Sequence, residues 1–591
     1  FQKQGVARGV QLGGRILIGD EMGLGKTVQA IALACRYSNE WPLLIIAPTS
    51  MCLPWCEELE RWCPFLKPGD INLVRSHHNG ALKDARVTIL SYGLVTNGKE
   101  KERLMESIMR ADFQVAICDE AHYLKNKDSV RAQHILPVLE YARRCILLTG
   151  TPALNRPVEL FPLVSTLMPE KGPVPVFRNY KQFTERFCNA HKVFLGRGGG
   201  RGGVRMDVSG SSNLPELHRL LTEHAMIRRL KVDVLTQLPA KRRQRILLDL
   251  SRAKLNASQS AAMSELKELQ KQMKNLPYED PRSRHLWSPM CVQLAQVKAT
   301  LAAEYCLELL PSCGNNKLLF FCHHIKMLDT VESACTSSPL GIQVFRIDGS
   351  VEKGERNNMI KAFQSLPDSR YAVFLLSIGA ANCGVTLTAA STAVFGELEW
   401  TPGNLLQAED RCHRIGQHAT QVNIHYLVAQ DTADEAMWGV LQRKVKNLGA
   451  AIDGKERQRL QVEGTRNDWE GNGNGDDDDG GGEGGEGGGT SADKEDVGGG
   501  SNEALSLMAR RAKQEKLVKR ERERNAFTSL FGIGKAKKPA AAAAVSPAGS
   551  ASAARAGCSS QSPAAAAASQ GSIEIDLTCS DDEGGGAAAA A

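Results

Sequence analysis

The residues best suited to chemistry in this chain begin with a glycine-rich octapeptide, Asp20-Glu-Met-Gly-Leu-Gly-Lys-Thr27. Gly23 and Gly25 carry no side chains, so backbone N–H groups there can approach phosphate oxygens at the start of a helix. Lys26 can neutralise the charge of β- and γ-phosphates, and the hydroxyl of Thr27 can coordinate Mg²⁺. The octapeptide therefore predicts a cradle for the phosphates of a nucleotide.

Asp20 departs from the strict form of this pattern, which has a glycine at that position. The flanking sequence nevertheless agrees with a phosphate loop. An apolar run at 15–18 predicts the preceding strand, and residues 28–35 predict the following helix.

An acidic motif, Asp119-Glu-Ala-His122, follows the apolar run at 115–118. Acidic residues at the carboxyl end of a parallel strand lie where open α/β sheets bind ligands, so Asp119 can hold Mg²⁺. Glu120 is then positioned to orient and deprotonate an attacking water. A solvated acidic turn is the alternative for this tetrapeptide, and its order after Lys26 disfavours that alternative.

Two arginines in the stretch 407–417, Arg411 and Arg414, are predicted to share one helical face because they are three residues apart. Cations supplied by a second element can offset the negative charge that develops on a γ-phosphate. On a separate lobe they would reach the nucleotide only when a cleft closes, which would couple hydrolysis to lobe movement. The alternative is a pair of surface arginines bound to carboxylates.

The elements that must position these residues are predicted from short apolar, β-branched runs, each followed by turn or helix-start residues. They occur in two groups, which predicts an α/β fold with two parallel-sheet lobes. The runs are at 15–18, 43–47, 87–90, 115–118 and 145–148, and then at 318–322, 343–347, 372–376, 393–395 and 423–428.

The predicted organisation has four parts: a first ATP-binding lobe at 1–188, a helical insertion and linker region at 189–295, a second lobe at 296–450 and a largely disordered tail at 451–591. Helical spacing at 214–230 and 253–273 marks the insertion, which also carries a Gly/Arg patch at 196–203. The tail is too poor in large apolar residues to form a core, apart from a charged helix candidate at 505–524. That candidate is either a solvated helix or a nuclear import signal.

Composition limits the class of protein. The chain of 591 residues is 42% hydrophobic and 24% charged, and it contains no apolar run of about 20 residues that would span a membrane. Sixteen cysteines without regular spacing indicate reduced thiols of the cytosol or nucleus, and we expect no structural zinc. The net charge of +7 permits a polyanionic partner. The chain begins at Phe1 inside its predicted nucleotide site, so we expect a fragment.

As an ordered set, these motifs resemble those of Swi/Snf-type DNA-dependent ATPases of helicase superfamily two, over about 1–448. The resemblance rests on Phe1-Gln2-x-x-Gly5, the octapeptide, the DEAH motif at 119–122, Thr149-Gly-Thr-Pro152, the stretch 227–234 with Leu238-Pro-x-Lys241, and 407–417. It implies two RecA-like lobes, ATP with Mg²⁺, and translocation along double-stranded DNA in the nucleus. It also implies that Gln2 reads adenine and that Gln407 belongs to the nucleotide-binding residues.

Within this family the chain resembles the annealing helicases that remodel branched DNA such as stalled replication forks. The segments that carry this are 209–214, 346–350 and 380–386. Chromatin remodellers have a Gly-Gly pair where this chain has Ala381 and Asn382, which disfavours that alternative. An RNA helicase and a recruitment scaffold with weak ATPase activity are further alternatives; the ending Ile415-Gly-Gln417 disfavours the first, and the intact catalytic residues disfavour the second.

Two binding surfaces complete the predictions. Thr49, Ser50, Ser91 and Thr386 lie at loop ends that match the DNA backbone contacts of such motors, although turn or cap residues are the alternative. In the tail, Ile573, Ile575 and Leu577 alternate before an acidic run at 580–583 and resemble a SUMO-interacting motif. An inert acidic tail is the alternative there.

Overall fold

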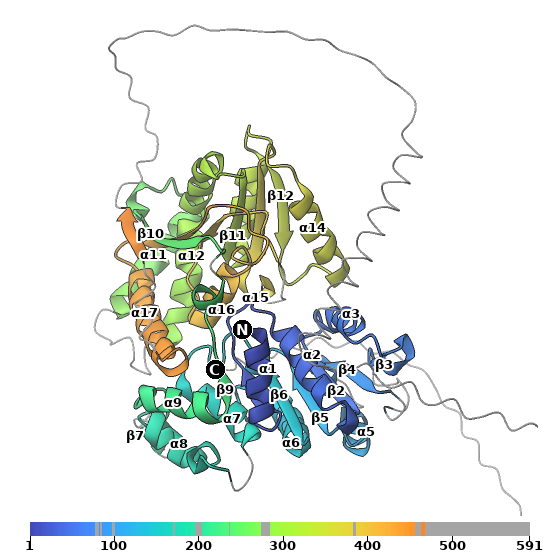
Figure 1. Ribbon diagram of the computed structural model, residues 1–591. Coiled ribbons are helices and arrows are strands. Elements are labelled where there is room, and N and C mark those ends of the chain that lie inside the picture. The colour runs from blue at the N-terminus through green and yellow to red at the C-terminus, as the bar shows by residue number, and fades with distance from the viewer. Residues whose placement is uncertain are drawn as a thin grey trace, which may run out of the picture. The chain divides into compact units, whose positions relative to one another are not determined.

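The computed structural model describes residues 1–76, 82, 85–96, 101–168, 172–194, 204–235, 237–273, 284–381, 386–454 and 462–466 (Figure 1). Two seven-stranded sheets form its framework, and every strand pair within each sheet is parallel. The predicted fold class of two parallel-sheet α/β lobes is confirmed. Within the described residues, no helix is long and apolar enough to cross a membrane.

The first sheet has the strand order β3-β4-β2-β5-β6-β1-β9. Its strands are β1 (Arg15–Ile18), β2 (Leu43–Ala47), β3 (Ile71–Leu73), β4 (Val87–Ser91), β5 (Val115–Cys118), β6 (Arg144–Leu148) and β9 (Met226–Ile227). The helices of this lobe are α1 (Gln2–Gln11), α2 (Lys26–Arg36), α3 (Cys52–Trp62), α4 (Tyr92–Thr96), α5 (Lys101–Arg110), α6 (Val130–Tyr141), α7 (Phe161–Leu167), α8 (Tyr180–Phe187) and α9 (Leu214–His224). A separate antiparallel pair joins β7 (His191–Phe194) to β8 (Val204–Asp207).

Alternation along the strands buries both faces of this sheet. On β1, Ile16 and Ile18 belong to one hydrophobic cluster and Leu17 to the cluster on the other face. All five residues of β2 are buried. Because both faces are covered, the strands read as continuous apolar runs, which is why the sequence revealed them.

The second sheet has the strand order β12-β13-β11-β14-β15-β10-β16. Its strands are β10 (Ala240–Leu248), β11 (Lys317–Cys322), β12 (Gln343–Ile347), β13 (Ala372–Ser377), β14 (Thr392–Phe395), β15 (Gln421–Ala429) and β16 (Val462–Arg466). The remaining helices are α10 (Lys231–Val234), α11 (Ala257–Met273), α12 (Arg284–Leu309), α13 (Ile325–Thr336), α14 (Lys353–Ser365), α15 (Ile378–Ala381), α16 (Pro402–Glu409) and α17 (Ala433–Ile452).

The region expected as a helical insertion at 189–295 is divided between the two sheets. The helix predicted at 214–230 ends at His224, and Met226–Ile227 then pairs with β1 as a strand of the first sheet. β10 pairs along its whole length with β15 of the second sheet. The boundary at 295/296 falls inside α12, so the second lobe begins before the predicted position.

The tail predicted to begin at 451 also differs at its start. α17 continues to Ile452, and residues 462–466 form β16 beside β10. The residues of β16, Val-Glu-Gly-Thr-Arg, are mostly polar and do not form an apolar run, so the sequence did not predict this edge strand. Its pairing depends on β10, more than two hundred residues earlier in the chain.

Candidate nucleotide site

The loop between β1 and α2 has the backbone geometry that a phosphate cradle requires. Gly23 and Gly25 have φ angles of +88° and +71°, which glycine adopts without strain. α2 begins at Lys26, so the N–H groups of its first turn are free to bind an anion. The Lys26 ammonium donates to the carbonyl oxygens of Asp20 at 3.0 Å and Glu21 at 3.4 Å. A phosphate oxygen is a stronger acceptor for this cation than either carbonyl, so the cradle fits a nucleotide phosphate.

Asp20, the departure from the glycine pattern, has a structural partner. Its carboxylate is fully buried and accepts hydrogen bonds from Arg229 Nε and from Gln29 Nε2, both at 2.9 Å. A second guanidinium nitrogen of Arg229 donates to the other carboxylate oxygen. A buried carboxylate needs such pairing. Asp20 therefore ties the phosphate loop to the segment after β9 without disrupting the cradle.

The two acidic residues of the DEAH motif are held by different partners at the end of β5. Asp119 Oδ2 accepts from the buried Trp55 Nε1 at 2.9 Å, and Asp119 Oδ1 accepts from the backbone N–H of Glu120 at 2.9 Å. Glu120 has a left-handed backbone with φ of +49°. Its Oε2 lies 3.2 Å from His122 Nδ1. A left-handed backbone is unfavourable for a residue with a side chain such as glutamate, and such residues occur often at active sites.

The pKa values of these carboxylates move in opposite directions. Burial, followed by the negative charge of Glu120, raises the pKa of Asp119 to about 6. Burial alone would raise the pKa of Glu120, but its hydrogen bond to His122 and the charges of His122, Lys26 and Arg411 lower it to about 2. Burial also lowers the pKa of Lys26, although Glu120 and Asp119 oppose that change. Glu120 is therefore ionised at neutral pH.

Asp119 and Thr27 are the residues present that fit Mg²⁺. A cation beside Asp119 would remove the repulsion that contributes to its raised pKa. Thr27 follows Lys26 in the first turn of α2, so its hydroxyl belongs to the same cradle. Carboxylate and hydroxyl oxygens are hard ligands of the kind that Mg²⁺ binds.

The prediction that Arg411 and Arg414 share a helical face was wrong. α16 ends at Glu409, and both arginines lie in the turns that follow. The N–H of Arg411 bonds to the carbonyl of Ala408, only three residues back, which tightens and ends the helix. The turns still bring the arginines to the cradle. A Cβ added at Gly23 would lie 3.8 Å from Cγ of Arg414, and Arg411, which is buried, acts on the pKa of Glu120.

A largely buried ion cluster holds these turns. Lys231, Glu409 and Asp410 are buried in it, and Lys241 and Arg243 are half-buried. Glu409 accepts from Arg243 Nε and Nη2, each at 2.7 Å. Asp410 Oδ1 lies 2.8 Å from Lys241 Nζ and 3.0 Å from Lys231 Nζ. Burial would raise the pKa of Glu409, but Arg243 and Lys241 lower it to about 2. These two carboxylates directly precede Arg411. The cluster therefore fixes the start of residues 411–414, here named the arginine turn.

Residues 228–231, here named the basic segment, connect the phosphate loop to the arginine turn. Glu21 accepts from the N–H of Lys231 at 2.7 Å, and its own N–H donates to the carbonyl of Arg229 at 3.0 Å. Lys231 Nζ donates to the carbonyl of His413 at 2.7 Å. This segment lies within the family motif at 227–234, and the sequence pattern indicates no role for it. Its three cations within four residues were the only indication of a site in the sequence. The partners that these cations bind lie far away along the chain and could not be predicted from it.

The two glutamines expected at the nucleotide lie at different places. Gln2 Nε2 donates to the carbonyl of Leu24 at 3.4 Å, and a Cβ added at Gly25 would lie 2.4 Å from this nitrogen. Gln2 therefore contacts the cradle. Gln407 is buried in α16, and its Nε2 donates to Thr151 Oγ1 at 2.9 Å. Gln407 thus contacts the loop after β6.

Three of the four residues expected at DNA lie at the carboxyl ends of neighbouring strands. A Cβ added at Gly93 would lie 4.0 Å from Thr49 Oγ1 and 3.8 Å from Ser91 Oγ. Thr49 is exposed, Ser50 is half-buried and Ser91 is buried. Thr386 lies elsewhere, where its hydroxyl accepts from Arg414 Nη1 at 3.0 Å.

Several predictions fall outside the described residues. They are the SUMO-type residues Ile573, Ile575 and Leu577, the Gly/Arg patch at 196–203 and the helix candidate at 505–524.

Comparison with known proteins gives the class to which this fold and site belong. A model of the SNF2-related domain matches residues 1–290, and a model of the helicase conserved C-terminal domain matches residues 302–416. The loop at 20–27 lies within the first matched range, and Arg411 and Arg414 lie within the second. The chain belongs to the SNF2-related family of helicase-type ATPases.

Among its relatives is the DNA annealing helicase and endonuclease ZRANB3 of Bos taurus, which is 42% identical over 475 residues, 80% of this chain and 42% of that protein. ZRANB3 of Homo sapiens is 42% identical over 479 residues, with the same two coverages of 80% and 42%. The SWI/SNF-related matrix-associated actin-dependent regulator of chromatin subfamily A-like protein 1 of Xenopus tropicalis is 40% identical over 456 residues, 76% of this chain and 44% of that protein.

The chain therefore spans less than half the length of these curated relatives. Among solved structures, a Sulfolobus solfataricus SWI2/SNF2 ATPase core in complex with dsDNA is similar at a TM-score of 0.34 and 22% identity, covering 77% of this chain and 92% of that one.

Proposed function

We propose that this chain is the ATPase motor of an annealing helicase, which hydrolyses ATP with Mg²⁺, moves along double-stranded DNA and rewinds branched DNA such as stalled replication forks. The observation that carries this proposal is the meeting of charges from two sheets at one phosphate loop. Lys26 and Glu120 come from the first lobe, and Arg411 acts on the pKa of Glu120 from the second. Relatives named as DNA annealing helicases support the choice of substrate.

Each residue of the site has a role in this proposal. Gly23, Gly25 and Lys26 hold the phosphates, and Thr27 with Asp119 holds the metal, which neutralises phosphate charge when bound. Glu120, ionised by its environment, orients and deprotonates the attacking water. Arg411 and Arg414 offset the charge on the γ-phosphate, an effect worth about 10³ to 10⁵ in rate in related phosphoryl transfers.

Hydrolysis would be coupled to movement because the arginines belong to the second lobe. Gln407 bonds to Thr151, and Lys231 bonds to the carbonyl of His413, so contacts that cross between the sheets surround the nucleotide site. Opening of the lobes would withdraw Arg411 and Arg414 from the cradle. Closing around a bound nucleotide would restore them.

Thr49, Ser50 and Ser91 are proposed to contact the DNA backbone from the first lobe, and Thr386 from the second. Hydroxyl groups at loop ends can hold phosphates without reading base sequence. The bond from Arg414 to Thr386 gives this last contact a direct connection to the arginine turn. A motor that grips duplex in this way stabilises rezipped strands, so hydrolysis would drive annealing.

The ATPase rate with different nucleic acids tests the proposal. We expect forks and single-to-double-strand junctions to stimulate hydrolysis more than single strands, RNA or nucleosomes do. ATP should also rewind a bubble held open by a single-strand-binding protein, and Lys26→Ala should not. Strong stimulation by nucleosomes without rewinding would assign the chain to chromatin remodelling, and no stimulated hydrolysis would favour a scaffold.

Nuclear localisation and a SUMO contact are proposed on narrower grounds. The relatives' names refer to chromatin and DNA annealing, which supports action in the nucleus.

The alternating Ile573, Ile575 and Leu577 could add a strand to the sheet edge of SUMO. NMR titration of SUMO with the tail peptide tests this, and shifts no larger than those of an Ile575→Ala, Leu577→Ala peptide would refute it.

A further inference from the structure

The last turns of α17 belong to the hydrophobic core of the first lobe, although the helix follows β15 of the second sheet. Leu448, Ala451 and Ile452 are buried in the same cluster as Leu217 and Leu221 of α9. Burial on this scale favours a fixed docking of the helix end. α17 is therefore a structural link between the two sheets.

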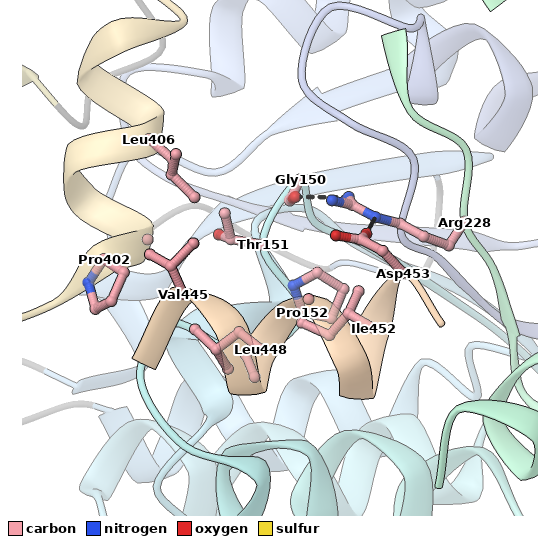
Figure 2. A pocket seen from close by; sticks show the side chains of 13 residues that line it. Gly150, Thr151, Pro152, Arg228, Pro402, Leu406, Val445, Leu448, Ile452 and Asp453 are labelled. Carbon is pink, nitrogen blue, oxygen red and sulfur yellow. Dashed lines mark hydrogen bonds and ion pairs between the residues drawn. The ribbon is translucent and has the colours of Figure 1, made fainter. Parts of the chain in front are cut away.

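An ion pair at the end of α17 joins this docking to the basic segment. Asp453, the C-cap residue, accepts from Arg228 Nε at 2.8 Å, and the two side chains are 3% and 6% exposed (Figure 2). Arg228 Nη1 then donates to the carbonyl of Gly150 at 2.9 Å and to that of Gly19 at 2.5 Å. One guanidinium thus connects Asp453 to two backbone loops of the first lobe.

Both carbonyls belong to loops that form the nucleotide site. Gly19 directly precedes the phosphate loop, and Gly150 lies against it. A Cβ added at Gly150 would meet Met22 Cγ at 2.3 Å and would lie 3.4 Å from Lys26 Nζ. The charge of Arg228 also contributes to the lowered pKa of Lys26. The guanidinium is therefore within electrostatic reach of the phosphate-binding lysine.

The contact between α17 and the loop after β6 is not uniformly packed. A pocket of about 30 Å³, large enough to hold a water, lies beside the ion pair (Figure 2). Thr151 and Pro152 of the first lobe line it, together with Leu406 of α16 and Val445 of α17. Apolar side chains around a void can repack at small cost, whereas a buried ion pair cannot lose one partner cheaply. The ion pair is therefore the fixed point of this contact.

We propose that Asp453 is a positioning residue for ATP hydrolysis: it orients Arg228 so that the guanidinium holds the carbonyls of Gly19 and Gly150, and thereby couples docking of α17 to the geometry of the phosphate loop. This inference rests on the proposed ATPase function. Loss of the carboxylate charge weakens the charge-assisted hydrogen bond that fixes the plane of the guanidinium. The loops that it joins then separate, and the phosphate loop loses its preset shape.

Asp453→Asn and Asp453→Glu test the inference against a control from the same helix. Asn447→Ala is the control because Asn447 Nδ2 donates to Ser211 Oγ at 2.9 Å, a contact of α17 that does not touch the nucleotide loops. Hydrogen exchange of peptides covering 19–27 and 149–153 gives a readout that needs no activity. We expect faster exchange in both peptides for Asp453→Asn, partial rescue by Asp453→Glu, and wild-type exchange for Asn447→Ala.

Kinetics on the whole chain separate positioning from folding. In Asp453→Asn we expect the KM for ATP to rise by about fivefold to tenfold with a smaller fall in kcat, at a temperature where circular dichroism shows the chain folded. Exchange and KM equal to those of Asn447→Ala would overturn the inference. If the wild-type chain hydrolyses no ATP with any DNA, the proposed function fails, while faster exchange confined to 19–27 and 149–153 still establishes the link.

Discussion

The acidic end of β5 and the arginine turn both supply charge to the same phosphate loop, but they are held in different ways. Asp119 and Glu120 are set by a strand end and by one nearby partner each, Trp55 and His122. The arginine turn follows a helix that has already ended, and its position depends on a buried ion cluster. Variants that remove a charge at the acidic end should therefore remain folded, whereas variants that remove a charge from the ion cluster should lose stability.

That cluster draws its members from distant parts of the chain. Lys231 lies in α10 and Lys241 and Arg243 lie in β10, whereas Glu409 and Asp410 lie at the end of α16. Each carboxylate binds two cations. Loss of one carboxylate would therefore leave buried positive charges without a partner. Chemistry and stability are thus separable in the first region and joined in the second.

The largest expected effect is at the arginine turn itself. Arg414→Ala removes a cation that offsets γ-phosphate charge and should lower DNA-stimulated hydrolysis by about 10³-fold or more, with DNA affinity little changed. Arg110→Ala is the control, because Arg110 forms an exposed pair with Glu106 on α5. Steady-state ATPase and DNA-binding titrations measure both quantities. Full stimulation in Arg414→Ala would place this arginine outside the site.

The acidic end should show loss of turnover without loss of binding. Glu120→Gln removes the proposed base and should reduce hydrolysis by about 10²- to 10⁴-fold while ATP affinity is retained. Lys26→Ala should lose both, because its ammonium holds the phosphates. Nucleotide titration and single-turnover hydrolysis distinguish these outcomes. Turnover near that of the wild type in Glu120→Gln would remove Glu120 from its assigned role.

The ion cluster should reveal itself in stability. Asp410→Asn removes the negative charge that Lys231 and Lys241 share and should lower the free energy of unfolding by about 3 to 5 kcal/mol. The exposed carboxylate of Glu106 gives the control: Glu106→Gln should change it by less than about 0.5 kcal/mol. Denaturant unfolding followed by circular dichroism measures both variants. Equal effects would show that the cluster is not what holds the arginine turn.

The smallest expected effect concerns pH and Mg²⁺. Burial and the charge of Glu120 raise the pKa of Asp119 from its ordinary 3.8 to about 6, so protons compete with a metal ion as the pH falls below 6. The apparent dissociation constant for Mg²⁺ should rise by up to about tenfold per pH unit between pH 6 and 5, and change little between pH 8 and 7. Asp119→Asn should abolish this dependence. Titration of Mg²⁺ against bound nucleotide gives the constant, and the same slope in Asp119→Asn would assign it to another group.

Sequence alone determined most strands of the two sheets, although not β3, β9, β10 and β16, together with the phosphate loop and the acidic motif. Buried parallel strands are continuous apolar runs. Asp119 and Glu120 follow β5 directly, and Lys26 begins the helix after β1, so local order fixes their place. Gly23 and Gly25 adopt positive φ angles, which glycine favours, so their residue type alone indicates the turn. These features depend on neighbours close in the chain, which is why the two lobes and the first half of the site could be predicted.

Only the tertiary structure decided what surrounds them. The helix expected to carry Arg411 and Arg414 ends at Glu409, because the carboxylates there bind cations that lie more than 150 residues earlier in sequence. Asp20 stands where the pattern has glycine because Arg229 pairs with it. Local patterns report which side chains could be buried; a buried charge is stable only with a partner, and folding across the whole chain selects that partner.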